Sequence, residues 1–391
     1  MTVTALPPGA RLLHVGPPKT GTTAVQKAMH HGRATLAEHG VLYPGRTSRP
    51  RDASLELLRP AERRAGAWDT LVAEVAATGA ERVCISSESL SLLNDAQAAE
   101  AVAGLGGDSV HVVITARPVD ALLPSVWQQH VRNVVGAPSY EDWLRSVLLG
   151  APGDAVHDRF WRLHDLADQV RRWSAAAAPE RVVVLVAQEG DRSFLLHTFE
   201  DLLDLPRGTL VPRVDVSNPS LTRFSGELLL ALDREAQERG WSPAEYAEKV
   251  RTDVAYHLRS RPREPQDLKS LPAWAAERAA EVNAARADLL SADPPSRVIG
   301  DPETLRPEAR PIAVDPGRDG AAVRPLLSVQ LAAGVAAAAV EGERGRLRAA
   351  EDRIAGLRAE LARLRERPPT AGARVRRAAG RLRGAVLDRR T

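Results

Sequence analysis

The segment "VGPPKTGTTAVQKAM", Val15 to Met29, contains residue types that can bind a phosphate group. Gly16 and Gly21 flank four residues, and Thr22 and Thr23 stand where a helix is predicted to begin. Gly21 lets backbone approach a ligand closely, and the N–H groups of residues 21–23 would point into the loop. A helix N-terminus also favours an anion. The segment therefore predicts an anion-binding loop, with an ordinary Gly/Pro turn capped by Thr as the competing interpretation.

The position of the lysine distinguishes this loop from an ATP-binding one. The ATP loop G-x-x-x-x-G-K-[ST] places its lysine directly after the second glycine. Here that position holds Thr22, and Lys19 lies in the middle of the loop. A lysine there can lie over a phosphate as a point charge, near a bridging oxygen. We identify no magnesium-binding Asp after a strand, so a P-loop nucleotide kinase or NTPase is the alternative with less support.

The heptapeptide "PPKTGTT", Pro17 to Thr23, resembles the 5′-phosphosulfate loop of sulfotransferases that use 3′-phosphoadenosine-5′-phosphosulfate (PAPS). In that family the loop lysine contacts the phosphosulfate, and the following Gly-Thr-Thr cradles the 5′-phosphate. The resemblance implies that Lys19 acts in catalysis and that the cofactor is bound by Lys19, Thr20, Gly21, Thr22 and Thr23. It also implies that no metal is required.

A second element, "VHVVITARPVDALLPSVWQQHV", strengthens the resemblance. The family has an arginine at a strand end and a serine eight residues later, both on the 3′-phosphate. Arg117 and Ser125 match this pattern. An arginine offers a charged fork to a phosphate, and a serine on the next helix offers a short hydroxyl donor. The resemblance therefore implies that Arg117 and Ser125 bind the cofactor.

The contacts to the adenosine are less well defined by the sequence. The R-K-G-x-x-G-x-x-K stretch of cytosolic eukaryotic members is missing. A segment at Ser217–Leu232 resembles the Asn-x-Ser-Leu segment of bacterial members, and its candidates are Asn218, Ser220 and Arg223. Trp127 and Trp143 could stack on the adenine, but we favour core packing for both.

A candidate general base follows another predicted strand. Sulfuryl transfer needs an acceptor hydroxyl or amine in line with the sulfur, a base to take its proton, and cations near the leaving phosphate. The segment "CISSESL" offers Glu88 at a strand end, where α/β sheets place their sites. Related sulfotransferases use His or Glu. We predict Glu88 as the base, although it could simply cap a helix; His130 is a lesser alternative, and His14 is better explained as a buried, hydrogen-bonded residue.

These residues need a scaffold that brings them together. Short, nearly continuous apolar runs alternate with helical patterns, which is typical of strands buried on both faces of a parallel sheet. The expected strands are Arg11–Gly16, Glu81–Glu88, Val110–Arg117 and Arg181–Glu189. The helical stretches include Thr22–Glu38, Thr70–Ala77, Ala96–Leu105 and one after Asp191, a candidate N-cap. We predict an α/β fold, a three-layer parallel sheet flanked by helices; the resemblance implies the P-loop-like sulfotransferase architecture.

The predicted organisation has four parts. Residues 1–290 form the α/β domain, and residues 291–325, rich in Pro, Asp and Gly, form an irregular linker. Residues 326–367 form a helix with Leu and Ile at coiled-coil spacing, which predicts self-association. Residues 368–391 form a basic tail, which could be an interfacial helix on anionic lipid or a solvated chain end.

Composition limits the class of protein. No run of about 18 apolar residues predicts a transmembrane helix, and the N-terminus does not resemble a signal peptide. The single cysteine, Cys84, excludes a disulfide scaffold and a cysteine zinc site, so we expect a cytoplasmic protein. Residues 341–391 contain 15 Arg and 7 acidic residues, a net charge of +8. The whole chain has a net charge of +3, so residues 1–340 have a net charge of about −5. Nucleic acid is therefore not an expected partner of the main domain.

The sequence predicts a PAPS-dependent sulfotransferase that acts on a small-molecule, carbohydrate or lipid acceptor. Loops and the helical segment Phe224–Leu290 are expected to shape the acceptor site. A non-catalytic, nucleotide-binding assembly protein built around the C-terminal helix is a further alternative.

Overall fold

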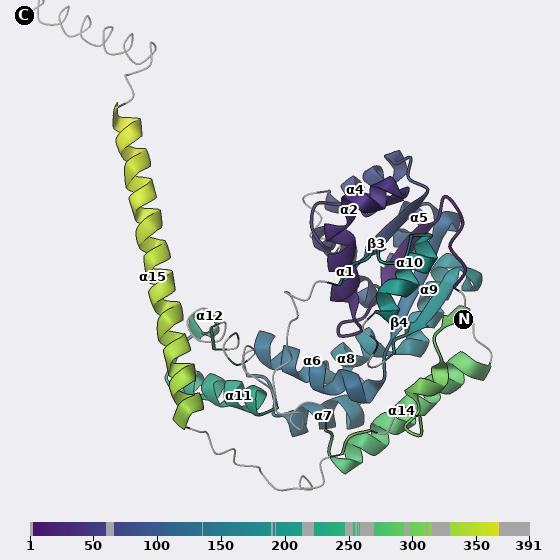
Figure 1. Ribbon diagram of the computed structural model, residues 1–391. Helices are drawn as coiled ribbons and strands as arrows, with labels where there is room; N and C mark the ends of the chain where they lie inside the picture. The colour runs from purple at the N-terminus through teal and green to yellow at the C-terminus, as the bar shows by residue number, and fades with distance from the viewer. Residues whose placement is uncertain are drawn as a thin grey trace, which may run out of the picture. The chain divides into compact units, whose positions relative to one another are not determined.

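A six-stranded parallel sheet forms the centre of the computed structural model (Figure 1). Its strand order is β2-β3-β1-β4-β5-β6, and every neighbouring pair is parallel. The strands are β1 (Arg11–Val15), β2 (Val41–Leu42), β3 (Arg82–Ser86), β4 (Val110–Ala116), β5 (Val182–Val186) and β6 (Arg297–Ile299). The structure describes residues 3–59, 66–134, 136–188, 191, 193–212, 223–246, 253–254, 256, 258, 270–292, 297–309, 312–314 and 329–366.

Helices connect the strands and cover both faces of the sheet. Between β1 and β4 the chain forms α1 (Thr22–His31), α2 (Arg33–Glu38), α3 (Arg51–Leu58), α4 (Ala67–Ala77), a 3-10 turn (Glu88–Leu92) and α5 (Asp95–Gly104). After β4 come α6 (Val119–Asn133), α7 (Tyr140–Leu149), α8 (Ala155–His164), α9 (Leu166–Ala177), α10 (Phe194–Leu203), α11 (Arg223–Glu238), α12 (Pro243–Tyr246), α14 (Ala273–Ala292) and α15 (Val329–Glu366).

The strand residues alternate between two apolar clusters, one on each face of the sheet. On β1, Leu13 and Val15 pack with residues of α3, α4, α5, α9 and α14, whereas Leu12 packs with residues of α1, α2 and α10. Val112 and Ile114 of β4 lie on the first face, and Val113 lies on the second. The predicted α/β class, a helix layer on each side of a parallel sheet, is confirmed.

The four predicted strands correspond to β1, β3, β4 and β5. The edge strands β2 and β6 were not predicted, because runs of two and three residues carry no readable pattern. β6 lies inside the segment 291–325 that was expected to be irregular, and it pairs with β5. The helix expected over Thr22–Glu38 is divided at Gly32 into α1 and α2.

The chain divides into two compact units. The first comprises Met1–Pro243 and Leu258–Leu326 and contains the sheet, so it extends beyond the predicted boundary at residue 290 and omits residues 244–257. The second comprises Ala244–His257 and Leu327–Thr391. Its long helix, α15, lies where a helix over 326–367 was predicted. Within this unit Arg346 of α15 donates to the Asp253 carboxylate at 2.7 Å.

Several sequence predictions fall outside the described residues. They are the basic tail at 368–391, and Asn218 and Ser220; the Arg223 side chain is likewise not described. Among the helices that are described, none has a stretch that is both apolar enough and long enough to cross a lipid bilayer.

Candidate functional site

Apart from Ser125, the predicted site residues lie at or just after the carboxyl ends of three neighbouring strands. β1 lies between β3 and β4, with Leu13 opposite both Ile85 and Val112 in the two ladders. From β1 the chain forms β2 and β3 on one side of that strand, and then β4, β5 and β6 on its other side. The carboxyl end of β1 is therefore the topological switch point, where α/β folds place ligands. The 16–21 loop, Glu88 and Arg117 directly follow these strands.

The loop after β1 is closed by two buried threonine hydroxyls. Thr20 Oγ1 donates to the Pro17 carbonyl at 2.8 Å, and Thr22 Oγ1 donates to the Gly16 and Pro17 carbonyls at 3.2 and 3.3 Å. The Thr22 hydroxyl therefore holds the loop backbone. Thr23 is exposed. Thr22, at the start of α1, can close the loop because its side chain points back toward Gly16.

The loop backbone takes unusual conformations at Lys19, in the middle of the loop, and at Gly21, directly before α1. Lys19 has φ 71° and Gly21 has φ 97°, both in the left-handed region that L-residues with side chains avoid. A non-glycine residue held there marks a site where the surrounding structure fixes the backbone. Among the described residues, no side chain caps the first turn of α1. Its first N–H groups are therefore available to an anion, in the way a phosphate loop requires.

Arg117 reaches from the end of β4 to this loop. Its Nη1 donates to the Lys19 carbonyl at 2.9 Å, across 98 residues of sequence. The two elements of the sequence motif are thus brought into direct contact. Ser125 lies two turns into α6, and its Oγ donates to the Ala121 carbonyl of the same helix at 3.3 Å. The structure contains no direct bond between Arg117 and Ser125 among the contacts of the described residues.

Glu88 begins the 3-10 turn after β3, and its side chain is 21% exposed. Its Oε2 accepts from Arg49 Nη1 at 3.3 Å. Burial raises the pKa of Glu88 above its usual range, while the positive charges of Arg49 and Lys19 act in the opposite direction. The Lys19 charge is therefore close enough to affect this carboxyl group, which links Glu88 to the loop. A carboxyl group with a raised pKa is a suitable general base.

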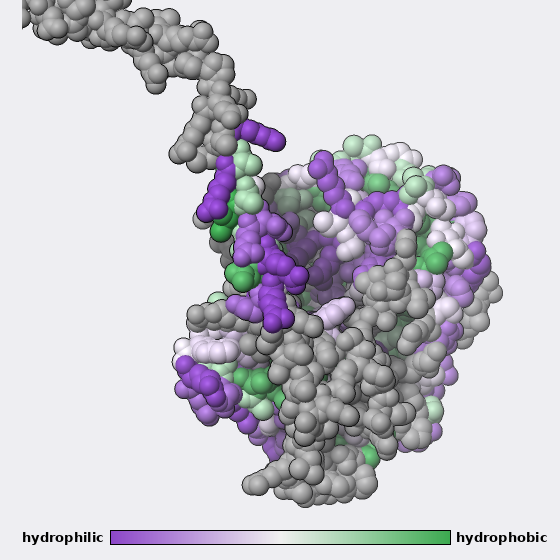
Figure 2. All heavy atoms as spheres, turned by 60° about the vertical axis from the view of Figure 1, so that its left-hand side comes forward, coloured by the Kyte–Doolittle hydropathy of each residue, from purple (hydrophilic) through white to green (hydrophobic). Residues whose placement is uncertain are grey.

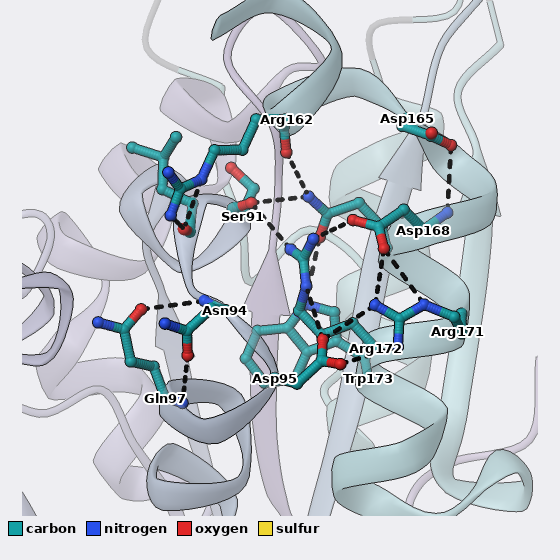
Figure 3. A network of polar contacts seen from close by, with 12 residues as sticks. Ser91, Asn94, Asp95, Gln97, Arg162, Asp165, Asp168, Arg171, Arg172 and Trp173 are labelled. Carbon is teal, nitrogen blue, oxygen red and sulfur yellow. Dashed lines mark hydrogen bonds and ion pairs between the residues drawn. The ribbon is translucent and has the colours of Figure 1, made fainter. Parts of the chain in front are cut away.

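A network of polar contacts holds the turn that carries Glu88 (Figure 3). The Ser91 carbonyl accepts from Gln169 Nε2 at 2.7 Å and from Arg172 Nη1 at 3.3 Å, both on α9. Arg162 of α8 donates to the Leu92 carbonyl at 2.9 Å. These side chains satisfy carbonyls at the end of a short 3-10 turn, where the helix itself offers no partner. The position of Glu88 is consequently fixed by two helices that are remote in sequence.

The two histidine alternatives differ in their surroundings. His14 is fully buried, and its ring nitrogens lie 2.9 Å from Ser86 Oγ and 2.9 Å from Thr115 Oγ1. Burial lowers the pKa of His14 to about 3, so its ring is neutral and confined to the sheet. This confirms it as a buried, hydrogen-bonded residue. His130 is partly exposed near the end of α6, three residues before Asn133.

The two tryptophans considered for adenine stacking are core residues. Trp127 is 1% exposed and packs against Tyr140 in a tilted arrangement at 4.7 Å between ring centroids, while Trp143 is 2% exposed and meets Phe160 edge-on. The structure also brings three unpredicted residues to the site, Arg49, Asn283 and Arg286. The sequence pattern that could have indicated Asn283 and Arg286 is their spacing. Both are polar residues, three or four positions from the buried Ala279 and Leu290 and on the same helix face as Ala276.

Comparisons with known proteins leave the family unassigned. No protein-family model matches the chain, and no curated protein matches it. Its fold is similar to that of a sulfotransferase from Alicyclobacillus acidocaldarius, at 16% sequence identity and a TM-score of 0.38, covering 61% of this chain and 98% of the other. Within the described ranges, no three His, Cys, Asp or Glu side chains are grouped as metal ligands.

Proposed function

We propose that this protein transfers the sulfuryl group of PAPS to a hydroxyl or amine of an acceptor. One observation carries the proposal: Arg117 donates to the Lys19 carbonyl at 2.9 Å, so the loop and the arginine of the resemblance meet at one edge of the sheet. A phosphoadenosine ligand has a phosphate at each end of its ribose and needs two anion sites at a fixed separation. The loop would serve the 5′-phosphosulfate, and Arg117 with Ser125 would serve the 3′-phosphate.

The loop residues fit a phosphosulfate. Gly21 and Thr23 are exposed at the start of α1, where the N–H groups of the first turn favour an anion. Lys19 is held in the left-handed region, and its charge would lie near the oxygen that joins sulfur to phosphorus. As that S–O bond breaks, negative charge develops on the 5′-phosphate. A preorganised cation at this position would stabilise the transition state.

The same loop is poorly suited to ATP. The position that carries the lysine of an ATP loop holds Thr22, which is 1% exposed and bonded to two loop carbonyls. A longer side chain at this buried position would displace the loop. The kinase or NTPase alternative therefore lacks the residue that contacts a β- or γ-phosphate.

Glu88 is the proposed general base. In the transfer step, the acceptor oxygen or nitrogen forms a bond to sulfur, and the bond from sulfur to the 5′-phosphate oxygen breaks. The acceptor proton moves to the Glu88 carboxylate, and 3′-phosphoadenosine-5′-phosphate (PAP) leaves. The ion pair with Arg49 keeps Glu88 oriented, and burial makes the carboxyl group a stronger base than one in water. We propose Lys19 and Glu88 as the catalytic pair.

The acceptor is proposed only as a class: a small molecule, a carbohydrate or a lipid headgroup with a hydroxyl or amine. A direct test incubates the full chain with sulfur-35-labelled PAPS and a panel of such acceptors, and follows labelled product and PAP together. We expect a labelled product with at least one acceptor and its loss in Lys19→Met.

Two outcomes would contradict the proposal. ATP-dependent phosphorylation of an acceptor would support the kinase alternative. Binding of PAP without labelled product from any acceptor would support a non-catalytic nucleotide-binding protein. Asp108→Asn is a control for removal of a carboxylate charge away from the site, because this carboxylate is 95% exposed and paired with Arg181 at the amino ends of β4 and β5.

A further inference from the structure

Helix α14 contacts the turn between β4 and α6, residues 117–120, through two buried polar side chains. Asn283 is fully buried, and Arg286 is 6% exposed. The two residues are three positions apart and therefore lie on the same face of the helix. α14 also packs against α6 and α9, so this face is turned toward the interior of the unit. Polar side chains at such positions are rare unless their hydrogen-bonding groups are satisfied.

Asn283 is bonded to the turn through both ends of its amide. Its Oδ1 accepts from the Val119 main-chain N–H at 2.8 Å, and its Nδ2 donates to Asp120 Oδ1 at 2.8 Å. The first bond satisfies an N–H at the start of α6, which has no partner within the helix. The two bonds fix both the backbone and a side chain of the turn. Asn283 therefore restricts how α6 begins.

Arg286 is bonded to the main chain of Arg117, two residues before Val119. Its Nη1 donates to the Arg117 carbonyl at 2.9 Å, and its Nη2 donates to the His164 carbonyl at the end of α8. Both partners are main-chain carbonyls, and no carboxylate in the described residues forms an ion pair with Arg286. Burial lowers the pKa of Arg286 to about 10, against the charge of Asp165, so the guanidinium stays positive at neutral pH. A buried charge of this kind is costly unless hydrogen bonds compensate for the lost water, and here the two main-chain carbonyls accept them.

The role of the buried Arg286 is indicated by its neighbours. Arg286 and Arg117 line the same pocket, together with Thr20 of the loop, Gln169 and His164. Arg286 holds the main chain of Arg117, and Arg117 in turn donates to the Lys19 carbonyl. A continuous path of hydrogen bonds thus connects α14, at residue 286, to the loop at residue 19.

We infer that Asn283 and Arg286 are positioning residues, which hold the β4–α6 turn so that the Arg117 guanidinium is set for an anion. This inference rests on the proposed function for the identity of the anion. The positioning itself follows from the contacts. Through these two residues, α14, in the C-terminal third of the sheet domain, would contribute to the cofactor site, a contribution that the sequence motifs did not indicate.

A double-mutant cycle tests this inference. The affinity for PAP is measured by calorimetry in the full chain for wild type, Arg117→Met, Arg286→Met and the double variant. Arg278→Met is the matched control, because Arg278 is on the same helix but is half-exposed and paired with Glu281. We expect Arg286→Met to weaken PAP binding about tenfold, and Arg117→Met to add little in that background, because residues within one network couple strongly. Additive effects, or an unchanged affinity in Arg286→Met, would overturn the inference.

Two further measurements separate positioning from folding. Arg286→Lys retains the charge and should recover part of the affinity, whereas a variant that merely unfolds would lose affinity only in proportion to its unfolded fraction, seen by circular dichroism. Hydrogen exchange at Val119 reports on the turn without ligand. We expect faster exchange in Asn283→Ala and not in Arg278→Met; unchanged exchange would contradict the role of Asn283. If wild type does not bind PAP, the proposed function fails, while hydrogen exchange still decides the positioning role.

Discussion

The conformation of Gly21 makes it the sharpest single test of the loop. Gly21 has φ 97°, and a Cβ built there would lie 2.6 Å from Leu195 Cδ2. Gly21→Ala therefore introduces backbone strain and a steric overlap at once. Leu195 belongs to α10 and its side chain is flexible at the contacting end, so part of the overlap can be relieved by a side-chain rotation.

The magnitudes follow from these two contributions. A left-handed conformation costs an L-residue about 1–2 kcal/mol. Moving Leu195 off its preferred rotamer adds about 0.5–1.5 kcal/mol. We therefore expect the free energy of unfolding to fall by about 1.5–3.5 kcal/mol. Loss of one hydrogen bond from the loop to a charged phosphate costs about 1.5–3 kcal/mol, which corresponds to roughly 10- to 150-fold weaker PAP binding.

Gly153→Ala provides a matched control. Gly153 has φ 104°, lies in the exposed connection between α7 and α8, and a Cβ there would meet no described atom within 4 Å. It should lose about 1–2 kcal/mol of stability from backbone strain alone and keep wild-type PAP affinity. Urea unfolding and calorimetric titration with PAP measure both quantities. A Gly21→Ala protein that is folded and binds PAP within twofold of wild type would refute the assignment of the loop.

Three other predictions follow from the base and from α15. Glu88→Gln should lower turnover by about 10²-fold or more while leaving PAP affinity unchanged, and wild-type turnover would rule Glu88 out as the base. Arg49→Met removes a positive charge that lowers the pKa of Glu88, so this pKa should rise. Because a base acts only when deprotonated, the acidic limb of the kcat/KM profile should move to higher pH. No movement, or a shift to lower pH, would contradict the role of the ion pair. On α15, Leu347, Ile354 and Leu357 lie at coiled-coil spacing and are 61%, 49% and 60% exposed, and Figure 2 shows hydrophobic spheres among hydrophilic ones on this helix. If these side chains mediate self-association, Ile354→Asp should convert the associated species to monomer, as measured by light scattering. Ala355→Asp, on the neighbouring face, should not.

The central strands could be predicted because burial on both faces leaves continuous apolar runs such as "VVVLV" in β5. The edge strand β6 could not, since its three residues between Ser296 and Gly300 carry no period, and its pairing with β5 depends on the whole fold. The loop, Arg117 and Glu88 could be proposed from the sequence because each comes at or just after the end of a buried strand. Asn283 and Arg286 were missed because their roles depend on where α14 packs, and sequence spacing shows only that they share a face.

Likewise, the role of the Thr22 hydroxyl could not be read from its type. Its position at the helix start is compatible with a ligand contact and with a bond to the loop, and only the backbone path from Gly16 to Gly21 decides between them. The Glu88 and Arg49 pair also depends on a connection, between β2 and α3, that has no sequence pattern of its own.

The most direct measurement is thermal stability of the full chain with PAP and with ATP–Mg in parallel. A ligand that binds only the folded state stabilises it by about 2.7 kcal/mol at 100 times its dissociation constant. We expect a dose-dependent rise in melting temperature with PAP, no comparable rise with ATP–Mg, and loss of the PAP effect in Arg117→Met. Stabilisation by ATP–Mg and not by PAP would contradict the assignment of the loop and Arg117 to a phosphoadenosine ligand.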